Sequence, residues 1–233
     1  MGSRDTGRYM LMTLKLTFLG HAGFLLADGT HTVAIDPFLT GNPAAKVKPR
    51  DVRCDSIALT HAHSDHLGDT VAIAKANHAT VYAANELAIY LGEQGLTTEP
   101  GNPGGRIAAP FGWVAFTQAF HSSSYEGRYL GQPCGVVVRL GETTVYHTGD
   151  TGLFGDMALI GEIYRPDIAL ICIGDRFTMG PELGARAAEL VKPKVAVPMH
   201  YGTWPLLAAD ASGFTPKGIS VKTLSPGETW EYA

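Results

Sequence analysis

The sequence lacks the features of several large classes of protein. Only three of its 233 residues are cysteine, and no two form a CxxC pair, so neither a disulfide scaffold nor a thiolate zinc site is expected. The longest apolar runs have about the length of a strand and are too short to span a membrane. Neither sign of charge dominates, because 18 basic residues stand against 22 acidic ones. These absences predict a cytoplasmic protein with no general attraction to nucleic acid or to a membrane.

Signals for secretion, for internal repeats and for a nucleophilic side chain are also weak. Two arginines precede an apolar patch at the N-terminus, but Lys15 interrupts that patch and 14-LKLTFL-19 alternates as a strand does. No repeat with a period of about 20–50 residues is present. No GxSxG segment occurs, which argues against a serine nucleophile, and no cysteine lies beside a candidate base. We expect residues 1–11 to be disordered or an extension, and residues 12–233 to form one domain.

Short strand-like segments dominate the rest of the chain. They are rich in β-branched residues and are bounded by Gly, Pro, Asn or Asp. The pattern predicts strands at residues 13–19, 22–27, 32–36, 56–60, 79–84, 112–120, 135–140, 143–148, 167–174 and 194–199.

Helical periodicity fits between several of these strands. The first predicted helix begins at Ser64 or Asp65, the second has Asn85 as its cap, and the third begins at Pro181. Their apolar faces would contain Leu67, Val71 and Ala74, then Leu87, Tyr90 and Leu91, then Leu183, Ala187 and Leu190. Hairpins followed by strand–helix alternation indicate α/β layers, with the Gly/Pro-rich segment 92–105 joining two halves of one domain.

The densest set of polar side chains is 61-HAHSDH-66, directly after a strand-like run. An extended segment points residues i and i+2 to the same side, so His61 and His63 can reach one metal ion. Asp65 and His66 begin the next helix and can reach a second ion nearby. Imidazoles together with carboxylates suit zinc, manganese or iron.

Four residues cannot complete two coordination shells, so further ligands are needed downstream. His121, Asp150 and His200 each follow a strand-like run, as expected for a site built on loops at one end of an α/β fold. The alternatives are an ordinary strand-end histidine at His121, a turn aspartate at Asp150 and a core histidine at His200.

HAHSDH resembles the HxHxDH signature of the metallo-β-lactamase superfamily, and His121, Asp150 and His200 follow in that superfamily's ligand order. Further segments resemble a poorly characterised family of small bacterial and archaeal metal-dependent hydrolases, which is related to the ascorbate-6-phosphate lactonases. These segments are 19-LGHAGFLL-26, 35-IDPFL-39, 146-YHTGDTGLFGDM-157, 174-GDRFTMGPE-182 and 198-PMHYGTWP-205. The resemblance extends from about Met12 to Trp230, nearly the whole chain.

The resemblance implies a four-layer αββα sandwich of the α/β class, with the metals at one edge of the sheets. It assigns His61, His63 and His121 to the first ion, and Asp65, His66 and His200 to the second. Asp150 would bridge the two ions, and Asp36 would support the metal-binding loop through hydrogen bonds. For Asp36, which precedes Pro37, a plain turn is the alternative.

Several other residues are weaker candidates. His147, His21 and Tyr201 neighbour ligands in the sequence and could donate a proton to the leaving group, although His21 could equally tie a turn. Arg176 could hold an anionic substrate or only pair with Asp175. The basic stretch 46–50 is expected to be a solvated loop, with contact to a phosphate or carboxylate as the alternative.

The function expected from the resemblance is hydrolysis by a hydroxide that bridges two divalent transition-metal ions, zinc or manganese first and iron also open. Asp65 and Asp150 would be the catalytic carboxylates. The substrate would be a small ester-like molecule: a lactone, an ester or a phosphodiester, with an anionic one left open. The alternatives are a metal-dependent nuclease or phosphodiesterase acting on nucleic acid, redox chemistry at iron, and non-catalytic metal binding. A homo-oligomer is also left open.

Overall fold

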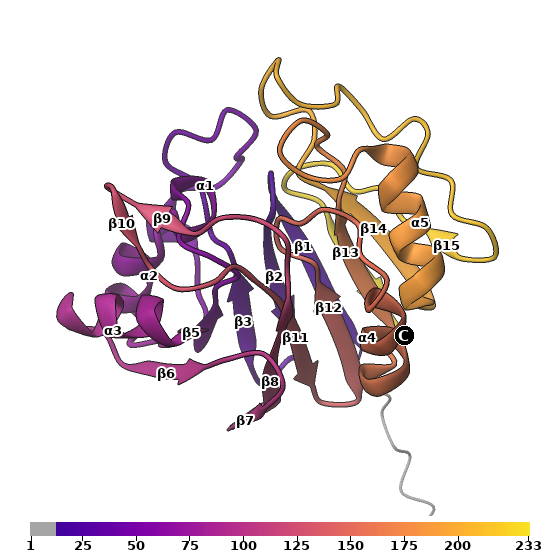
Figure 1. Ribbon diagram of the computed structural model, residues 1–233. Coiled ribbons are helices and arrows are strands. Elements are labelled where there is room, and N and C mark those ends of the chain that lie inside the picture. Colours follow the sequence, from indigo (N-terminus) through magenta and orange to yellow (C-terminus); the bar gives the residue numbers. More distant parts are fainter. Residues whose placement is uncertain (1–12) are drawn as a thin grey trace, which may run out of the picture.

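The computed structural model describes residues 13–233 and contains two seven-stranded sheets packed face to face, with helices on their outer sides (Figure 1). This is the four-layer αββα sandwich that the resemblance implies. The expectation for residues 1–11, and Met12 as the start of the domain, lie outside the described residues.

The first sheet has the strand order β16-β1-β2-β3-β4-β5-β6. Strands β16 to β3 pair antiparallel, and β3 to β6 pair parallel. The bounds are β1 Leu14–Gly20, β2 Gly23–Ala27, β3 Thr32–Ile35, β4 Ser56–Ala58, β5 Thr80–Ala84, β6 Thr98–Gly101 and β16 Thr229–Tyr232.

The second sheet has the order β15-β14-β13-β12-β11-β8-β7, with β12 to β15 parallel and β7, β8, β11 and β12 antiparallel. The bounds are β7 Arg106–Ala109, β8 Gly112–Gln118, β11 Cys134–Leu140, β12 Thr143–His147, β13 Ile168–Cys172, β14 Val195–Met199 and β15 Ser220–Val221. A small separate hairpin joins β9 Ser124–Tyr125 to β10 Arg128–Tyr129.

Helices α2 Thr70–Asn77 and α3 Asn85–Glu93 pack on the outer side of the first sheet, near α1 Ser64–Leu67 and the short 3₁₀ helix η1 Pro49–Asp51. Helices α4 Met157–Tyr164 and α5 Pro181–Val191 cover the second sheet (Figure 1). A large apolar core lies between the sheets, where Phe24, Phe116 and Tyr146 are fully buried. None of the helices in the described part of the chain is long and apolar enough to cross a bilayer.

All of the predicted strands are present, but the first predicted helix is divided into α1 and α2. The division falls at Gly68, whose φ is +44°, a conformation that side-chain-bearing residues rarely adopt. A Cβ atom at position 68 would lie 2.6 Å from the Cα of Phe38, so the space there fits only glycine. The positive φ of this glycine interrupts the helix. Leu67 and Ala74 are buried as predicted, whereas Val71 is only partly buried.

The predicted apolar face of α5 is wrong at Leu183, whereas Ala187 is buried and Leu190 packs partly buried against the core. Leu183 is 51% exposed, and the buried face consists of small residues, among them Gly184, Ala187 and Ala188. A Cβ atom on Gly184 would lie 2.6 Å from Cγ2 of Ile173, so the helix lies close to β13. Asn85 is also the first residue of α3 and not its cap. Helix α4 and the short edge strands were not predicted.

Candidate metal centre

Strand ends from both sheets bring the predicted ligands to one end of the sandwich. In the first sheet, 61-HAHSDH-66 follows β4 and runs into α1. In the second sheet, His121 follows β8, Asp150 follows β12 and His200 follows β14. The carboxyl ends of parallel strands meet at one edge of a sheet, which explains why residues so distant in sequence gather here.

Three imidazoles form the first group of candidate ligands, which we call the three-histidine group: His61, His63 and His121. Nδ1 of His63 lies 3.0 Å from Nε2 of His61 and 3.2 Å from Nε2 of His121. Four-coordinate zinc holds imidazole nitrogens at about 2.0–2.1 Å, which places ligand atoms about 3.3 Å apart. The three nitrogens therefore have the spacing that a single bound ion requires.

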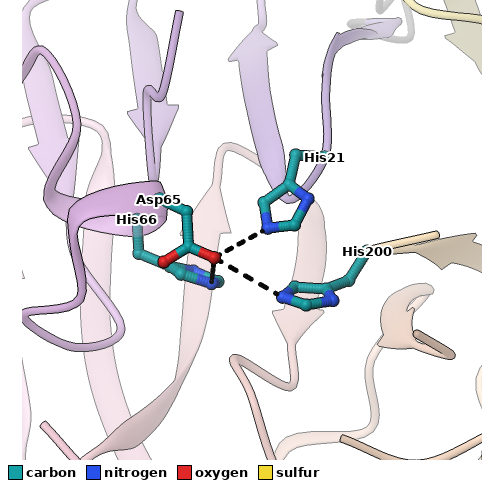
Figure 2. Close-up of side chains that lie close together, drawn as sticks. All are labelled: His21, Asp65, His66 and His200. Carbon is teal, nitrogen blue, oxygen red and sulfur yellow. Dashed lines mark hydrogen bonds and ion pairs between the residues drawn. The ribbon is translucent and has the colours of Figure 1, made fainter. Parts of the chain in front are cut away.

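The second group surrounds the carboxylate of Asp65, and we call it the Asp65 group: His21, Asp65, His66 and His200. Figure 2 shows three rings directed at one carboxylate oxygen, Oδ2 of Asp65. This atom lies 3.1 Å from Nε2 of His21, 4.0 Å from Nε2 of His66 and 3.9 Å from Nε2 of His200. The group thus includes one member, His21, that was not predicted to bind metal.

Asp150 lies between the two groups. Its Oδ2 is 3.0 Å from Nε2 of His200 and 3.6 Å from Nε2 of His121, and its Oδ1 is 3.3 Å from Nε2 of His66. Nε2 of His66, Oδ1 of Asp150 and Nε2 of His200 are buried, and no described residue gives them a well-formed hydrogen bond. Buried polar atoms without partners are costly, by about 1–3 kcal/mol each. Metal ions would supply the missing partners, so the donor set fits the cofactor that the motif implies.

Asp36 supports one candidate ligand in each group, His66 directly and His61 through Thr60. It is fully buried and accepts hydrogen bonds from the Thr60 amide at 2.9 Å and the Thr60 hydroxyl at 2.6 Å. It also accepts one from Nδ1 of His66 at 2.7 Å. Because the Thr60 hydroxyl donates to Asp36, it can accept from Nδ1 of His61, 3.0 Å away. In their neutral forms both imidazoles therefore carry the proton on Nδ1 and direct Nε2 at the site, which is the supporting role expected of Asp36.

Burial and neighbouring charges set the protonation of the candidate ligands. Burial lowers the pKa of His61, His63 and His121, so these rings are neutral near pH 7 and their lone pairs are available. Burial opposes ionisation of Asp150, but the nearby His200 and His66 hold its pKa well below the ordinary value.

His66 differs from the other histidines. Burial alone would lower its pKa, but Asp150 and Asp65 outweigh burial and raise the pKa well above the ordinary value. In the metal-free protein a proton on His66 therefore takes the place that a cation would take.

His21 directs Nε2 at the cluster and also ties turns together, and it is buried and does not line the pocket, so both alternatives left open by the sequence apply in part. It lies in the turn between β1 and β2, its Nδ1 pairs with the Thr203 hydroxyl at 2.9 Å, and its Nε2 pairs with Asp65. Burial and the neighbouring His200 lower the pKa of His21 to about 4. Its main-chain carbonyl accepts a hydrogen bond from the His200 amide at 2.7 Å, which joins turns from the two sheets.

The backbone is strained at this end of the molecule. His21, Asp36 and His200 have φ angles of +58°, +44° and +64°. A left-handed conformation costs about 1–2 kcal/mol in a residue other than glycine, and such strain gathers at functional sites. The packing around the cluster therefore holds these three side chains in place against a local preference.

Three of the weaker candidates lie elsewhere. His147 is fully buried between the sheets, where Nε2 donates to the Ala22 carbonyl at 2.8 Å and Nδ1 accepts from the Gly149 amide at 3.0 Å. Both ring nitrogens are occupied by backbone, which contradicts a role as proton donor. Arg176 is exposed and extends over the Phe177 ring, and neither it nor Tyr201 lines the pocket at the cluster.

A pocket of about 420 Å³ opens above the cluster. Its floor contains His63, Asp65, His121, Asp150 and His200, and its walls contain Ser122, Phe177, Trp204, Leu206 and Leu207. None of these wall residues was predicted from the sequence. The basic stretch 46–50 lines a different pocket, beside α2.

Comparison with known proteins places these observations in a family. Residues 15–200 match the model of the beta-lactamase superfamily domain. A UPF0173 metal-dependent hydrolase of Carboxydothermus hydrogenoformans is 50% identical over 92% of this chain and 98% of its own. The UPF0173 metal-dependent hydrolase YtkL of Bacillus subtilis is 45% identical over 94% of this chain and 100% of its own.

A solved structure is similar over nearly the whole chain. Igni18, described as a novel metallo hydrolase from the hyperthermophilic archaeon Ignicoccus hospitalis, is 36% identical to this chain. The TM-score is 0.87, over 95% of this chain and 99% of the other.

Proposed function

The chain belongs to the beta-lactamase superfamily and to its UPF0173 family of metal-dependent hydrolases, and within that family we propose that it is a binuclear enzyme that cleaves a small ester-like substrate. The substrate class is a lactone, a carboxylic ester or a phosphodiester. The observation that carries the proposal is the position of Asp150, with ligand atoms of both groups within 3.6 Å of its carboxylate.

The residues divide the work between binding and chemistry. Two divalent ions, with zinc or manganese first and iron also open, would polarise the scissile group and lower the pKa of a shared water to about 7. His61, His63 and His121 would hold the first ion, His66, His200 and Asp65 the second, and Asp150 both. Asp65 uses Oδ2 toward the ring nitrogens, which leaves Oδ1 to orient the attacking water.

The surroundings of the site support this division. Asp36 fixes which nitrogen of His66 carries the proton, and His21 holds the Asp65 carboxylate. The apolar walls border the floor and reduce its contact with water, which strengthens electrostatic interactions there. The three cysteines, all in the described part of the chain, are buried and unpaired. This agrees with the reducing cytoplasm, where we place the enzyme.

Metal analysis tests the binuclear site directly. Protein purified without added metal should contain about two transition-metal ions per chain, and His200→Ala should lose about one of them. His31→Ala is the matched control, because His31 is a partly exposed histidine beside Asp28 that lies outside the cluster. A wild-type content of one ion or none contradicts the proposal.

A substrate panel tests the reaction. Lactones, carboxylic esters, phosphodiesters, phosphomonoesters and thioesters should be offered to enzyme loaded with zinc or with manganese. Hydrolysis of at least one ester-like class, lost in Asp150→Ala, supports the proposal; no hydrolysis by protein that holds both ions overturns it. Salt-sensitive binding of RNA in a gel-shift series would instead favour the nuclease alternative.

A further inference from the structure

The pocket above the cluster combines a polar floor with apolar walls. All of its ionisable lining residues are candidate metal ligands, and among residues 13–233 no lysine or arginine lines it. Four of the wall residues are large and apolar: Phe177, Trp204, Leu206 and Leu207. A bound molecule therefore meets charge on one side and hydrocarbon on the other.

Two of these wall residues are also exposed to solvent. Phe177 is 55% exposed and Leu206 is 60% exposed. They come from different loops and line the same pocket, and Trp204 beside them packs against His21. Large apolar side chains gathered at the mouth of a cleft are typical of a ligand-binding surface.

Backbone hydrogen bonds fix both loops in place. In the loop that carries Phe177, the Asp175 amide donates to the Met179 carbonyl at 2.9 Å, and the Met179 amide donates to the Thr151 carbonyl at 3.0 Å. In the other loop, the Leu207 amide donates to the Trp204 carbonyl at 3.0 Å. The Ala208 amide donates to the Gly174 carbonyl at 2.9 Å and so ties the two loops together. The apolar walls are thus preformed.

The cationic side chains considered for an anionic substrate, Arg176 and those of residues 46–50, are not in the pocket lining. Arg176 lies against the Phe177 ring, with its guanidinium carbon 5.5 Å from the ring centroid. Lys48 and Arg50 line the separate pocket beside α2. In the wall, Ser122 is the one polar residue, and its hydroxyl lies 3.3 Å from Nε2 of His63.

From this arrangement we propose that the part of the substrate beyond the reacting bond is an uncharged alkyl or aryl group, which packs between Phe177 and the Trp204–Leu207 loop. The substrate class is an apolar ester or lactone, as opposed to a phosphorylated sugar or a nucleic acid. The assignment of the reacting bond rests on the proposed function; the assignment of the apolar group rests on the walls.

Two ladders of esters test the proposal on the metal-loaded enzyme: methyl alkanoates from acetate to hexanoate, and alkyl acetates from methyl to hexyl. Each ladder lengthens one side of the bond only. Burial of one methylene is worth about 0.8 kcal/mol, so kcat/KM should rise about fourfold per methylene along one ladder until the walls are covered. Monomethyl succinate, which ends in a carboxylate, should be at least tenfold poorer than methyl pentanoate. A flat response in both ladders, or a preference for the charged ester, overturns the proposal.

Truncation of the walls should flatten the ladder. Phe177→Ala and Leu206→Ala remove exposed side chains, so the fold should be preserved, and the gain per methylene should fall from about fourfold toward twofold or less. Leu159→Ala is the matched control for Leu206→Ala, because Leu159 is 50% exposed on α4 and does not line this pocket. Equal slopes in wild type, Leu206→Ala and Leu159→Ala contradict the assignment of the walls.

Calorimetry separates this inference from the proposed function. Acetate, butyrate and hexanoate are product-like carboxylates, and their affinity for metal-loaded protein should rise with chain length in wild type but not in Phe177→Ala. If affinity rises while no ester is cleaved, the apolar pocket stands and the proposed reaction falls. If esters are cleaved but affinity and rate ignore chain length, the proposed reaction stands and this inference falls.

Discussion

The three-histidine group and the Asp65 group lie side by side, yet they are built differently. The first contains three neutral imidazoles and no carboxylate of its own, and His63 and His121 are partly exposed toward the pocket. The second has a carboxylate at its centre and three buried imidazoles around it. One group therefore has no carboxylate of its own, whereas the other has one at its centre, and two members of each group line the pocket.

This difference suggests a division of labour between the two sites. An ion in the three-histidine group would be neutralised only through the shared Asp150 and could polarise a substrate in the pocket. An ion in the Asp65 group would be neutralised by Asp65 as well, which suits retention and the orientation of a nucleophile. Substitution of a residue that both groups share should affect both sites. Substitution of a residue that supports only one group should affect that site alone.

The largest effect is expected from Asp150→Asn, since Asp150 lies between the groups. The substitution keeps the shape but removes the charge that faces His66, His200 and His121. Because metal-ion catalysis is worth several kcal/mol, kcat should fall about 10²- to 10⁴-fold, with weaker binding at both sites. Steady-state kinetics and metal titration against a chelator measure the two effects. Retention of both ions and of near-normal kcat would remove Asp150 from the bridging position.

Asp36→Asn comes next, because Asp36 acts on both groups without touching either ion. The amide places N–H donors where His66 and Thr60 need an acceptor, which disfavours the tautomer that leaves Nε2 free. We expect about a 10- to 100-fold loss of metal affinity.

Thr60→Val is the partner experiment to Asp36→Asn. Valine keeps the shape of threonine but removes the hydroxyl beside Nδ1 of His61, so the loss should fall mainly on the three-histidine group. Competition with a chromogenic chelator gives the affinity of each site. Equal losses at the two sites in Thr60→Val would show that the groups are not supported separately.

Residues that share a short segment could be predicted from the sequence, because local geometry decides where they lie. The segment 61-HAHSDH-66 spans one strand end and one helix start. Its histidines and its aspartate were therefore expected to face two neighbouring metal ions. His121, Asp150 and His200 were found because each ends a strand and matches the ligand order of a known family. The structure brings all of them together, and their roles as ligands stay predictions.

Side chains whose direction depends on distant packing could not be predicted. His21 and His147 both adjoin strands, and nothing in GHAGF or YHTGD reveals that one faces the cluster and the other the backbone between the sheets. Phe177 follows two consecutive residues with positive φ, Asp175 and Arg176. No sequence pattern predicts a loop of this conformation. The substrate pocket was out of reach for the same reason.

His21→Asn should weaken metal binding in the Asp65 group only. Asparagine tolerates the positive φ of this turn but cannot hold Asp65 and Thr203 together as the imidazole does. Metal affinity should fall about tenfold in the Asp65 group and stay unchanged in the three-histidine group. Titration of metal-free protein with zinc, followed by calorimetry, should show one weakened step out of two. Two equally weakened steps would place His21 in a general structural role.

The smallest effect concerns the stability of the metal-free protein, in which His121 and His66, one from each group, should respond to pH in opposite directions. The folded pKa of His121 is lowered by burial, so the unfolded chain binds the extra proton below about pH 6.5, and this contribution to stability is lost as the pH falls. The folded pKa of His66 is raised, because the carboxylates outweigh burial, so its contribution is present at low pH and is lost as the pH rises through that pKa. Urea unfolding in the presence of a chelator, at pH 7.5 and pH 5.5, measures both. His121→Gln should reduce the loss of stability on acidification and His66→Gln should increase it, each by less than about 1.4 kcal/mol per pH unit. Since each variant is the control for the other, a shift of the same sign in both would show that the groups do not differ in charge as their geometry indicates.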